Sequence, residues 1–399
     1  MTVVEQNQRP VEIVGSTMDS LFTINTCKTY GCPNLGLATS PDYQWPDYRL
    51  GYPALHCRAC GSYPPLFNDE EFQRWAAACF TGYAREYGHF CPACYQAEVI
   101  RYGHNPGGSQ RLQCQRCKKV WTPKRQPLTN ALSPDAICSV PFIMDFQGEL
   151  AAQKLYLLFS FDAVRGNILH VSSNYTPYPA GNTLRYRWKG IRPTPTHHHD
   201  IIQSVALKER QFLQRSQFDE IQYGAAALKR NANGMILRPV IAAHGHFRVL
   251  KNRFPEVGTH IVAHECFLRG AIITAWAELF RQRRASLWFI EEKTVDEDNT
   301  DAWRLLGKTN QGWWKNQWQL WAQGRNQKMV CPLTDHRQDN GSKITLTASR
   351  RFFRWLAVQD EFQQSSRYSA AHIMRLVTAL ACQYNAQNDE NIPTVISPL

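Results

Sequence analysis

The pattern of hydrophobic and polar residues changes near residue 150. Beyond this point, Leu155–Phe161 is an apolar run of the kind that forms a strand buried on both faces. The run ends at Asp162, and a second run, Ile168–Val171, predicts the returning strand of a hairpin after a turn at 165–167. Three further strands are predicted, at 236–243, 259–263 and 287–290.

Helices are predicted where apolar residues recur every three or four positions. Asp200 can cap a helix that runs to about 215, and a helix over 266–284 places Leu268, Ile272 and Leu279 on one side. Amphipathic helices follow at about 349–363 and 369–386. The alternation of strands and helices predicts a mixed α/β core over 151–388, interrupted by a polar, Trp-rich segment at about 293–345.

The first 150 residues have shorter apolar stretches, more turn-forming residues and closely spaced cysteines. We expect a lead-in over 1–26 and a first cysteine-rich domain within 1–65, followed by a connecting helix over 66–90. A second cysteine-rich domain is predicted over 91–123, with the turn 103–108 joining two short strands. The stretch 124–150 is interpreted as a linker because prolines recur there, at Pro123, Pro127, Pro134 and Pro141.

Eight of the 13 cysteines form two quartets. Cys27-x4-Cys32 and Cys57-x2-Cys60 are separated by 24 residues, and Cys91-x2-Cys94 and Cys114-x2-Cys117 by 19. A CxxC turn presents two thiolates to one ion, and two such turns complete a tetrahedron. Because the cytosol keeps thiols reduced, the spacing predicts two structural zinc ions rather than disulfides. The other cysteines are interpreted as small buried hydrophobic residues.

Composition narrows the class of partner. With 399 residues, 43% of them hydrophobic and 12% aromatic, the chain is long and apolar enough to fold into several domains. Its net charge of +12 favours an anionic partner, either nucleic acid or an anionic membrane surface. No apolar stretch approaches 18 residues and no signal peptide is visible, so we expect a cytoplasmic protein without a membrane span.

A basic run in the second cysteine-rich domain favours nucleic acid. Between Val99 and Arg125 there is no Asp or Glu, and there are seven basic residues: Arg101, Arg111, Arg116, Lys118, Lys119, Lys124 and Arg125. Such a stretch suits a phosphate backbone, and the interleaved Tyr102 and Trp121 can pack on sugars or bases. For Trp121 we prefer a place in the small apolar core of the domain. The basic run alone leaves RNA open as the ligand.

The cysteine motifs resemble a known family. Cys27-x4-Cys32-Pro-Asn-x-Gly and Cys57-Arg-Ala-Cys60-Gly, and more closely Cys91-Pro-Ala-Cys94 with Gln110-Arg-Leu-Gln-Cys114-Gln-Arg-Cys117-Lys-Lys-Val-Trp-Thr, are similar to the N-terminal zinc ribbons of short bacterial insertion-sequence transposases of the DDE type. The resemblance is specific over 88–123, weaker over 27–61 and only architectural beyond 150. It implies a ribonuclease-H-like mixed sheet preceded by two small zinc-ribbon domains. It also implies DNA as the partner, a homo-oligomer on DNA and a nucleoid location.

In that family the core carries three acidic residues. Two divalent ions about 4 Å apart clamp the attacking and leaving oxygens, and Mg²⁺ requires carboxylate ligands. The resemblance assigns the catalytic roles to Asp162, Glu265 and Glu361, with Asp360 and Glu292 as alternates for the third. Asp162 is equally typical of a turn, and Glu265 of a helix N-terminus. Glu265 also stands where the family usually has an aspartate.

Two functional hypotheses follow from this resemblance. The first is an active transposase that cuts and joins DNA with Mg²⁺, and the second is a catalytically inactive, transposase-derived DNA-binding regulator. Three other features are assigned to structure: His197–His199 to a solvated loop, Trp314, Trp318 and Trp321 to one apolar helix face, and Arg281–Arg284 to the basic end of a helix.

The cysteine spacing yields a direct test. Metal analysis of the purified full-length protein should find two zinc ions per chain, because each quartet supplies the four thiolates of a closed structural site. A chain that folds without zinc would contradict this interpretation.

Overall fold

A computed structural model describes residues 24–50, 54–64, 66, 91, 93, 99–122, 133–146, 154–176, 200–218, 235–236, 239–296, 298–311, 316–334 and 341–390. Some sequence predictions lie outside these residues. They are the lead-in up to residue 23, the connecting helix after residue 66, Cys94, Lys124, Arg125, His197–His199 and Trp314.

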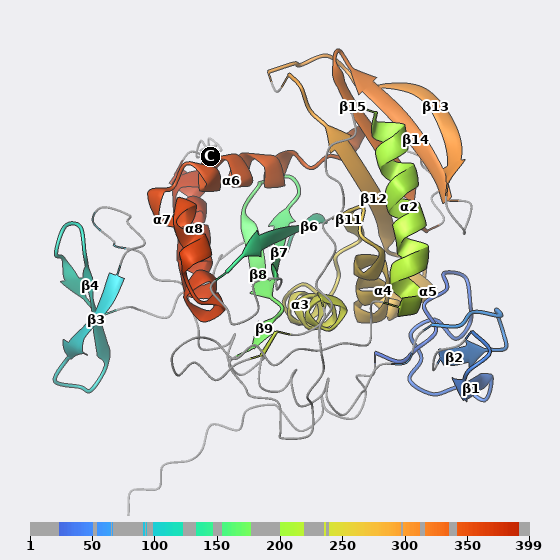
Figure 1. The fold of residues 1–399 in the computed structure, drawn as a ribbon, viewed down its shortest axis with the longest axis horizontal. Helices are drawn as coiled ribbons and strands as arrows, with labels where there is room; N and C mark the ends of the chain where they lie inside the picture. The colour runs from blue at the N-terminus through green and yellow to red at the C-terminus, as the bar shows by residue number, and fades with distance from the viewer. Residues whose placement is uncertain are drawn as a thin grey trace, which may run out of the picture.

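A mixed eight-stranded sheet forms the centre of the fold (Figure 1), with the strand order β13-β14-β15-β12-β11-β6-β7-β8. The strands are β6 (Ala136–Asp145), β7 (Lys154–Asp162), β8 (Ile168–Ser173), β11 (Thr259–Ala263), β12 (Ser286–Lys293), β13 (Arg304–Gln311), β14 (Asn316–Gln323) and β15 (Asn326–Pro332). Strands β6, β11 and β12 are parallel, β7 runs against β6 and β8, and β15, β14 and β13 extend the sheet in antiparallel order. The expected mixed α/β class is confirmed.

The stretch expected to be a linker contains β6, the strand between β7 and β11. Strand β6 pairs with β7 along its length but with β11 only as far as Ser139. Pro141 therefore lies where β6 is open on its β11 side, and proline is accommodated where a strand has an open edge. The sheet begins at Ala136, ahead of the boundary expected at 151.

Helices cover both faces of the sheet. Along β7, Leu157 and Phe159 face a core shared with α6 (Thr347–Ala357) and α8 (Ala370–Glu390). Tyr156 and Leu158 face the opposite core, which is shared with α2 (Ile201–Phe218), α3 (Pro239–Arg253), α4 (Cys266–Ala275) and α5 (Ala277–Arg281). The apolar run therefore belongs to a strand buried on both faces, as expected. The remaining core elements are α7 (Asp360–Gln363), the 3-10 turns at 341–343 and 365–367, and the strand pair β9 (Tyr175–Thr176) and β10 (Met235–Ile236).

Several local predictions are confirmed by hydrogen bonds. The Asp200 side chain accepts a hydrogen bond from the backbone N–H of Ile202 at 2.9 Å, so it caps α2 as expected. Strands β7 and β8 form the predicted antiparallel hairpin, and Gly166 takes φ +83° in its turn. The strand predicted at 259–263 coincides with β11, and the one at 287–290 lies within β12.

Two other predictions are wrong, and one is confirmed only in part. The segment 236–243 is mostly helix, because Pro239 begins α3 and a short apolar run does not by itself distinguish a strand from a buried helix. The helix expected over 266–284 divides into α4 and α5 at Trp276. Trp318 and Trp321 lie on strand β14, where a spacing of three directs them to opposite faces of the sheet rather than to one helix face.

The cysteine-rich segments form two small sheets. We call the described residues 24–64 the first cysteine domain, which contains the antiparallel pair β1 (Tyr43–Asp47) and β2 (Ala54–Cys57). The second cysteine domain comprises residues 91, 93 and 99–122. It contains the antiparallel sheet β3 (Val99–His104), β4 (Gln110–Cys114) and β5 (Val120–Trp121). In Figure 1 they lie at opposite sides of the view.

The first cysteine domain is packed into the core. Leu35 is only 1% exposed and belongs to the apolar cluster beneath α4 and α5. The Arg281 guanidinium at the end of α5 donates a hydrogen bond to the Leu35 carbonyl at 2.9 Å. Gly36 lies so close to α5 that a Cβ added there would overlap with the Ala277 Cβ. The domain therefore shares its folding with the core.

Gly36 provides a test of this docking. Gly36→Ala should destabilise the zinc-loaded chain in urea unfolding, because φ is +68° and the added methyl meets Ala277. The matched control is Gly31→Ala, which carries φ +83° but has nothing within 4 Å. The control should cost about 1 kcal/mol of backbone strain, and Gly36→Ala roughly 1–3 kcal/mol more through overpacking. Equal losses would show that the domain is not tightly docked.

Candidate metal centres and nucleic-acid interface

The first quartet converges on one point. The Sγ atoms of Cys27 and Cys60 are 3.6 Å apart, and those of Cys32 and Cys57 are 3.8 Å apart. All four sulfur atoms lie within 4.8 Å of one another. Two backbone turns bring them together, and Gly36 and Gly61, both in the left-handed region, follow the two cysteine pairs.

Polar groups around this cluster are directed at its sulfur atoms. Asn34 donates its backbone N–H to Cys32 Sγ at 3.4 Å and its side-chain amide to Cys57 Sγ at 3.5 Å. Such donors stabilise thiolates and hold metal ligands in orientation. Burial raises the pKa of the free Cys27 thiol to about 11. Metal binding must therefore displace the proton of Cys27.

The second quartet has three described members. Cys91 Sγ and Cys117 Sγ are 3.4 Å apart, and Cys114 completes a group within 4.8 Å. The backbone N–H of Cys117 is directed at Cys114 Sγ at 3.5 Å, and Lys118 closes the turn with φ +59°. Cys94, the fourth expected ligand, lies outside the described residues.

Both clusters fit zinc. Four cysteine thiolates, or three with a fourth on the same CxxC turn, form the closed tetrahedral donor set of structural zinc sites. Bound zinc would cross-link turns that have little apolar core of their own. Among the described residues, these two cysteine clusters are the only groups of three or more His, Cys, Asp or Glu side chains placed closely enough to share an ion.

Basic side chains cover the second cysteine domain. Arg101, Lys118 and Lys119 are exposed, as is Arg116, and Arg111 is half-buried with its guanidinium carbon 6.0 Å from the centre of the Tyr102 ring. Trp121 is half-buried and pairs with Leu112 in the small sheet, in line with the expected place in the domain core. The surface is thus positive beside a cysteine cluster.

Asp162 and Glu265 lie at opposite ends of the strands of the sheet. Asp162 pairs with Ile137 near the start of β6, and Ile137 pairs with His260 at the start of β11. Glu265 follows His260 by five residues, so about 15 Å of extended backbone separates the two positions. Ions about 4 Å apart cannot be held by both carboxylates. The structure therefore does not bring the first two predicted acids together.

Local contacts explain the position of Asp162. Its Oδ1 accepts hydrogen bonds from the backbone N–H groups of Val164 and Arg165, each at 2.9 Å, and its Oδ2 pairs with the Arg165 guanidinium at 3.0 Å. It is only 1% exposed. This is the arrangement of an aspartate that closes a hairpin turn.

Glu265 and Glu361 lie in other settings. Glu265 is buried directly before α4, at the end of the sheet where the parallel strands β11 and β12 finish. Glu361 is half-buried in α7, next to Phe362, whose ring packs 5.8 Å from that of Phe142 in β6. The β6 residues level with the end of β11, Ser139 to Pro141, include no carboxylate.

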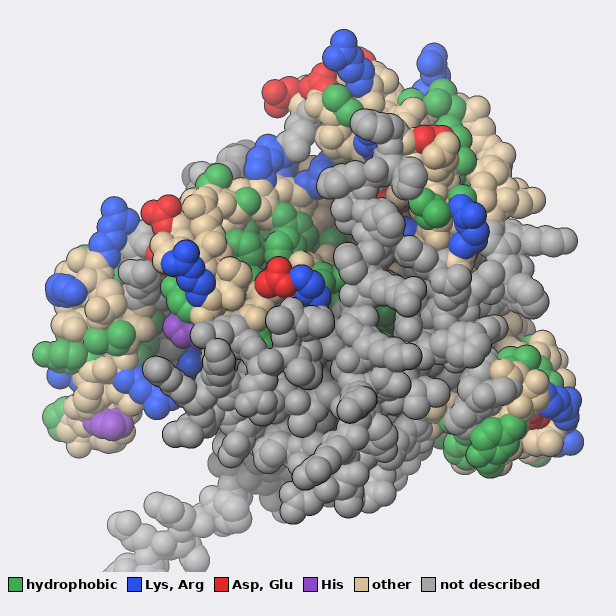
Figure 2. All heavy atoms as spheres, in the orientation of Figure 1, with side chains coloured by type: hydrophobic (Ala, Val, Ile, Leu, Met, Phe, Trp, Pro, Cys, Tyr) green, Lys and Arg blue, Asp and Glu red, His purple; other side chains and the backbone are tan. Residues whose placement is uncertain are grey.

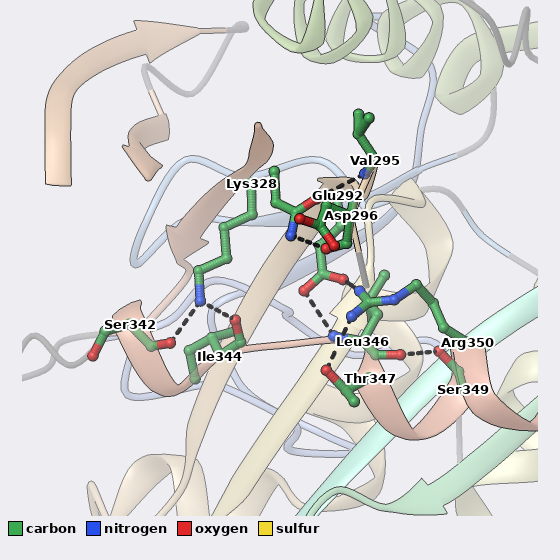
Figure 3. Close-up of polar contacts among 11 residues, drawn as sticks. Glu292, Val295, Asp296, Lys328, Ser342, Ile344, Leu346, Thr347, Ser349 and Arg350 are labelled. Atoms are coloured by element: carbon green, nitrogen blue, oxygen red, sulfur yellow. Dashed lines mark hydrogen bonds and ion pairs between the residues drawn. The ribbon is translucent and has the colours of Figure 1, made fainter. Parts of the chain in front are cut away.

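A largely buried charged cluster at this end of the sheet is not evident from the sequence (Figure 3). Glu292, at the end of β12, accepts a hydrogen bond from the backbone N–H of Leu346 at 2.8 Å and forms an ion pair with Arg350 of α6. Lys328 of β15 pairs in register with Glu292 and donates to the carbonyls of Ser342 and Ile344 at 2.6 and 2.7 Å. Glu292, the alternate third acid, is thus neutralised by Arg350.

Other charges nearby are paired as well. Glu291 lies 2.6 Å from the Lys208 ammonium of α2. His264, which precedes Glu265, lies 3.2 Å from Glu209 of the same helix, and burial lowers the pKa of its ring against the opposing effect of Glu209. Burial also lowers the pKa of Lys328 to about 7. These contacts could not be predicted from the sequence, because Lys208 and Glu291 are 83 residues apart and Glu209 and His264 are 55 residues apart.

Comparison with known proteins does not assign the chain to a family. No protein-family model, curated protein or solved structure matches the chain. Within the part of the chain that the structure describes, no helix combines the length and apolar character needed to cross a bilayer.

The ion pair of Glu292 with Arg350 is a stability test. Glu292→Gln leaves the partly buried Arg350 guanidinium without a counter-charge, so it should lower the free energy of unfolding by roughly 1–3 kcal/mol. The control is Glu256→Gln, whose pair with Arg284 is exposed and should be worth no more than about 1 kcal/mol. The double variant with Arg350→Met should recover part of the loss. Equal effects of the two glutamine variants in urea unfolding would contradict a buried charge pair.

Proposed function

We propose that this protein is a zinc-containing DNA-binding protein with a transposase-like, ribonuclease-H-like core. It acts by binding DNA rather than by assembling a strand-transfer site. The observation that carries this proposal is the second cysteine domain, where exposed basic side chains surround a cysteine cluster and where no acidic residue occurs from Val99 to Arg125. A phosphate backbone is the polyanion that such a surface suits.

The sheet topology supports the transposase-like core. Five strands of the large sheet come first in the chain: β6, β7, β8, β11 and β12. Numbered one to five in this chain order, they lie side by side in the order 3-2-1-4-5, and only the second of them, β7, runs antiparallel to the others. This is the strand order of ribonuclease-H-like folds. The strands β13 to β15 fall in the segment expected as an insertion, between the last of these five strands and α6.

The charges at the end of the sheet favour binding over cutting. A strand-transfer site needs several carboxylates free to hold two ions. Glu291 and Glu292 are instead paired with Lys208 and Arg350, and Asp162 closes a turn at the opposite edge. The inactive, transposase-derived DNA-binding protein is therefore the better-supported form of the hypothesis. The active transposase, with Asp162, Glu265 and Glu361 on Mg²⁺, remains the competing form.

Salt dependence tests the DNA-binding proposal. The logarithm of the association constant for duplex DNA should fall linearly with the logarithm of salt concentration. Replacing Arg101, Lys118 and Lys119 together by glutamine should reduce the magnitude of this slope by up to about 2.7, at about 0.9 for each lost phosphate contact. Arg304→Gln, an exposed arginine on β13, is the matched control and should leave the slope unchanged. Binding without salt dependence would contradict the proposal.

Cleavage is tested separately. Incubation of the zinc-loaded chain with supercoiled plasmid and Mg²⁺ or Mn²⁺ should produce no nicked, linear or joined DNA, because the predicted acids do not converge. Divalent-metal-dependent cleavage that is lost in Glu265→Gln and retained in Glu256→Gln would restore the active transposase and overturn the binding-only form.

A further inference from the structure

The two faces of the second cysteine domain differ in what covers them. Side chains alternate along a strand, so Val99 and Arg101 share one face of β3 and Ile100 lies on the other. The register shifts between Arg101 and His104, and Tyr102 is assigned to the face of Ile100 by its contact with Arg111, which precedes Leu112 on β4. Val99 pairs with Cys114 and Arg101 with Leu112, which places the first face on the side of the cysteine cluster. Leu112 and Cys114 are buried there. The face of Ile100 and Tyr102 is turned away from the cluster.

That second face is apolar and open. Ile100 is 45% exposed and Tyr102 is 48% exposed, although both are large and lie two residues apart on the same strand. The Arg111 guanidinium from the neighbouring strand lies over the Tyr102 ring, with its carbon 6.0 Å from the ring centre. In Figure 2 hydrophobic and basic side chains lie side by side on this domain, at the left of the view where Figure 1 places β3 and β4.

The ligand of this face must combine negative charge with flat apolar surface. A nucleotide does so, because its base can stack on a tyrosine ring while its phosphate meets arginine. In a duplex the faces of the bases are already stacked on one another, so this contact requires unpaired bases. No Asp or Glu from Val99 to Arg125 opposes the phosphates.

We propose that the open face formed by Ile100, Tyr102 and Arg111 binds unpaired bases of DNA by stacking on Tyr102. This inference rests on the proposed DNA-binding function and specifies its ligand. Arg101, Lys118 and Lys119 supply phosphate contacts that are common to single strands and duplexes, whereas Tyr102 distinguishes between them. A protein with this surface binds DNA where strands are open, such as at melted ends, loops or gaps.

The experiment uses the zinc-loaded full chain and three labelled probes of equal length: a DNA single strand, a DNA duplex and an RNA single strand. Tyr102→Ala should weaken binding of the DNA single strand by about 5- to 150-fold, the range of one lost base stack, and change duplex binding less than 2-fold. Tyr102→Trp should retain single-strand binding. Tyr48→Ala is the matched control, because Tyr48 is an exposed tyrosine, 64% accessible, in the first cysteine domain. It should leave all three affinities unchanged.

A second readout reports stacking directly. A DNA single strand that contains the fluorescent base 2-aminopurine should change its emission on binding the native chain and not on binding Tyr102→Ala. Zinc content and circular dichroism of each variant establish that the domain is folded.

The outcomes separate this inference from the function on which it rests. If Tyr102→Ala weakens single-strand and duplex binding equally, or weakens neither, the stacking face is wrong while DNA binding stands. A Tyr102-dependent affinity that is greater for RNA than for DNA assigns the ligand to RNA and overturns the DNA assignment. If the native chain binds none of the three probes, the proposed function itself fails.

Discussion

The position of β6 between β7 and β11 is the constraint on which the core depends. It pairs antiparallel with β7 and parallel with β11, so the chain leaves β7 and β11 at opposite ends of the strands. This pairing determines which side chains at the ends of β7 and β11 can contact one another. Asp162, at the end of β7, and Glu265, after the end of β11, are thus separated by about the length of a strand, whereas Glu292 and Arg350 are brought into contact.

Where strands β11 and β12 end, charged side chains of the sheet bind groups of the neighbouring helices. Glu292 accepts a hydrogen bond from the backbone N–H of Leu346, the N-cap residue of α6, and pairs with Arg350, while Glu291 pairs with Lys208 of α2. Helix N-termini carry N–H groups without partners in the helix, and a carboxylate from a neighbouring strand satisfies one of them. The helices on both faces are therefore held at the same end of β12. A carboxylate used in this way is not free to serve as a metal ligand.

The sequence predicts the parts of this protein that are encoded locally. The apolar run of β7, the Asp200 cap and the cysteine spacing each follow from neighbouring residues, and the structure agrees with them. Strand β6 was missed because Pro134 and Pro141 resemble linker residues, and only the open edge beyond Ser139 explains how Pro141 fits. The placement of Asp162 could not be predicted, because β6 precedes β7 in the sheet. The antiparallel pairing of β7 with β6 directs the end of β7, and with it Asp162, away from the end of β11. The role of Lys328 likewise depends on carbonyls from another segment.

The docking of the first cysteine domain has a consequence for synthesis of the chain. Leu35 and its partner Arg281 are 246 residues apart. At 5–20 residues per second, roughly 10 to 50 s pass on the ribosome between the emergence of the two. Until α5 is synthesised, Leu35 lacks part of the apolar cluster that covers it in the folded chain. Capture of a metal ion by Cys27, Cys32, Cys57 and Cys60 before α5 is synthesised would give this nascent segment a compact form early, and metal supply would then affect the folding of the chain on the ribosome.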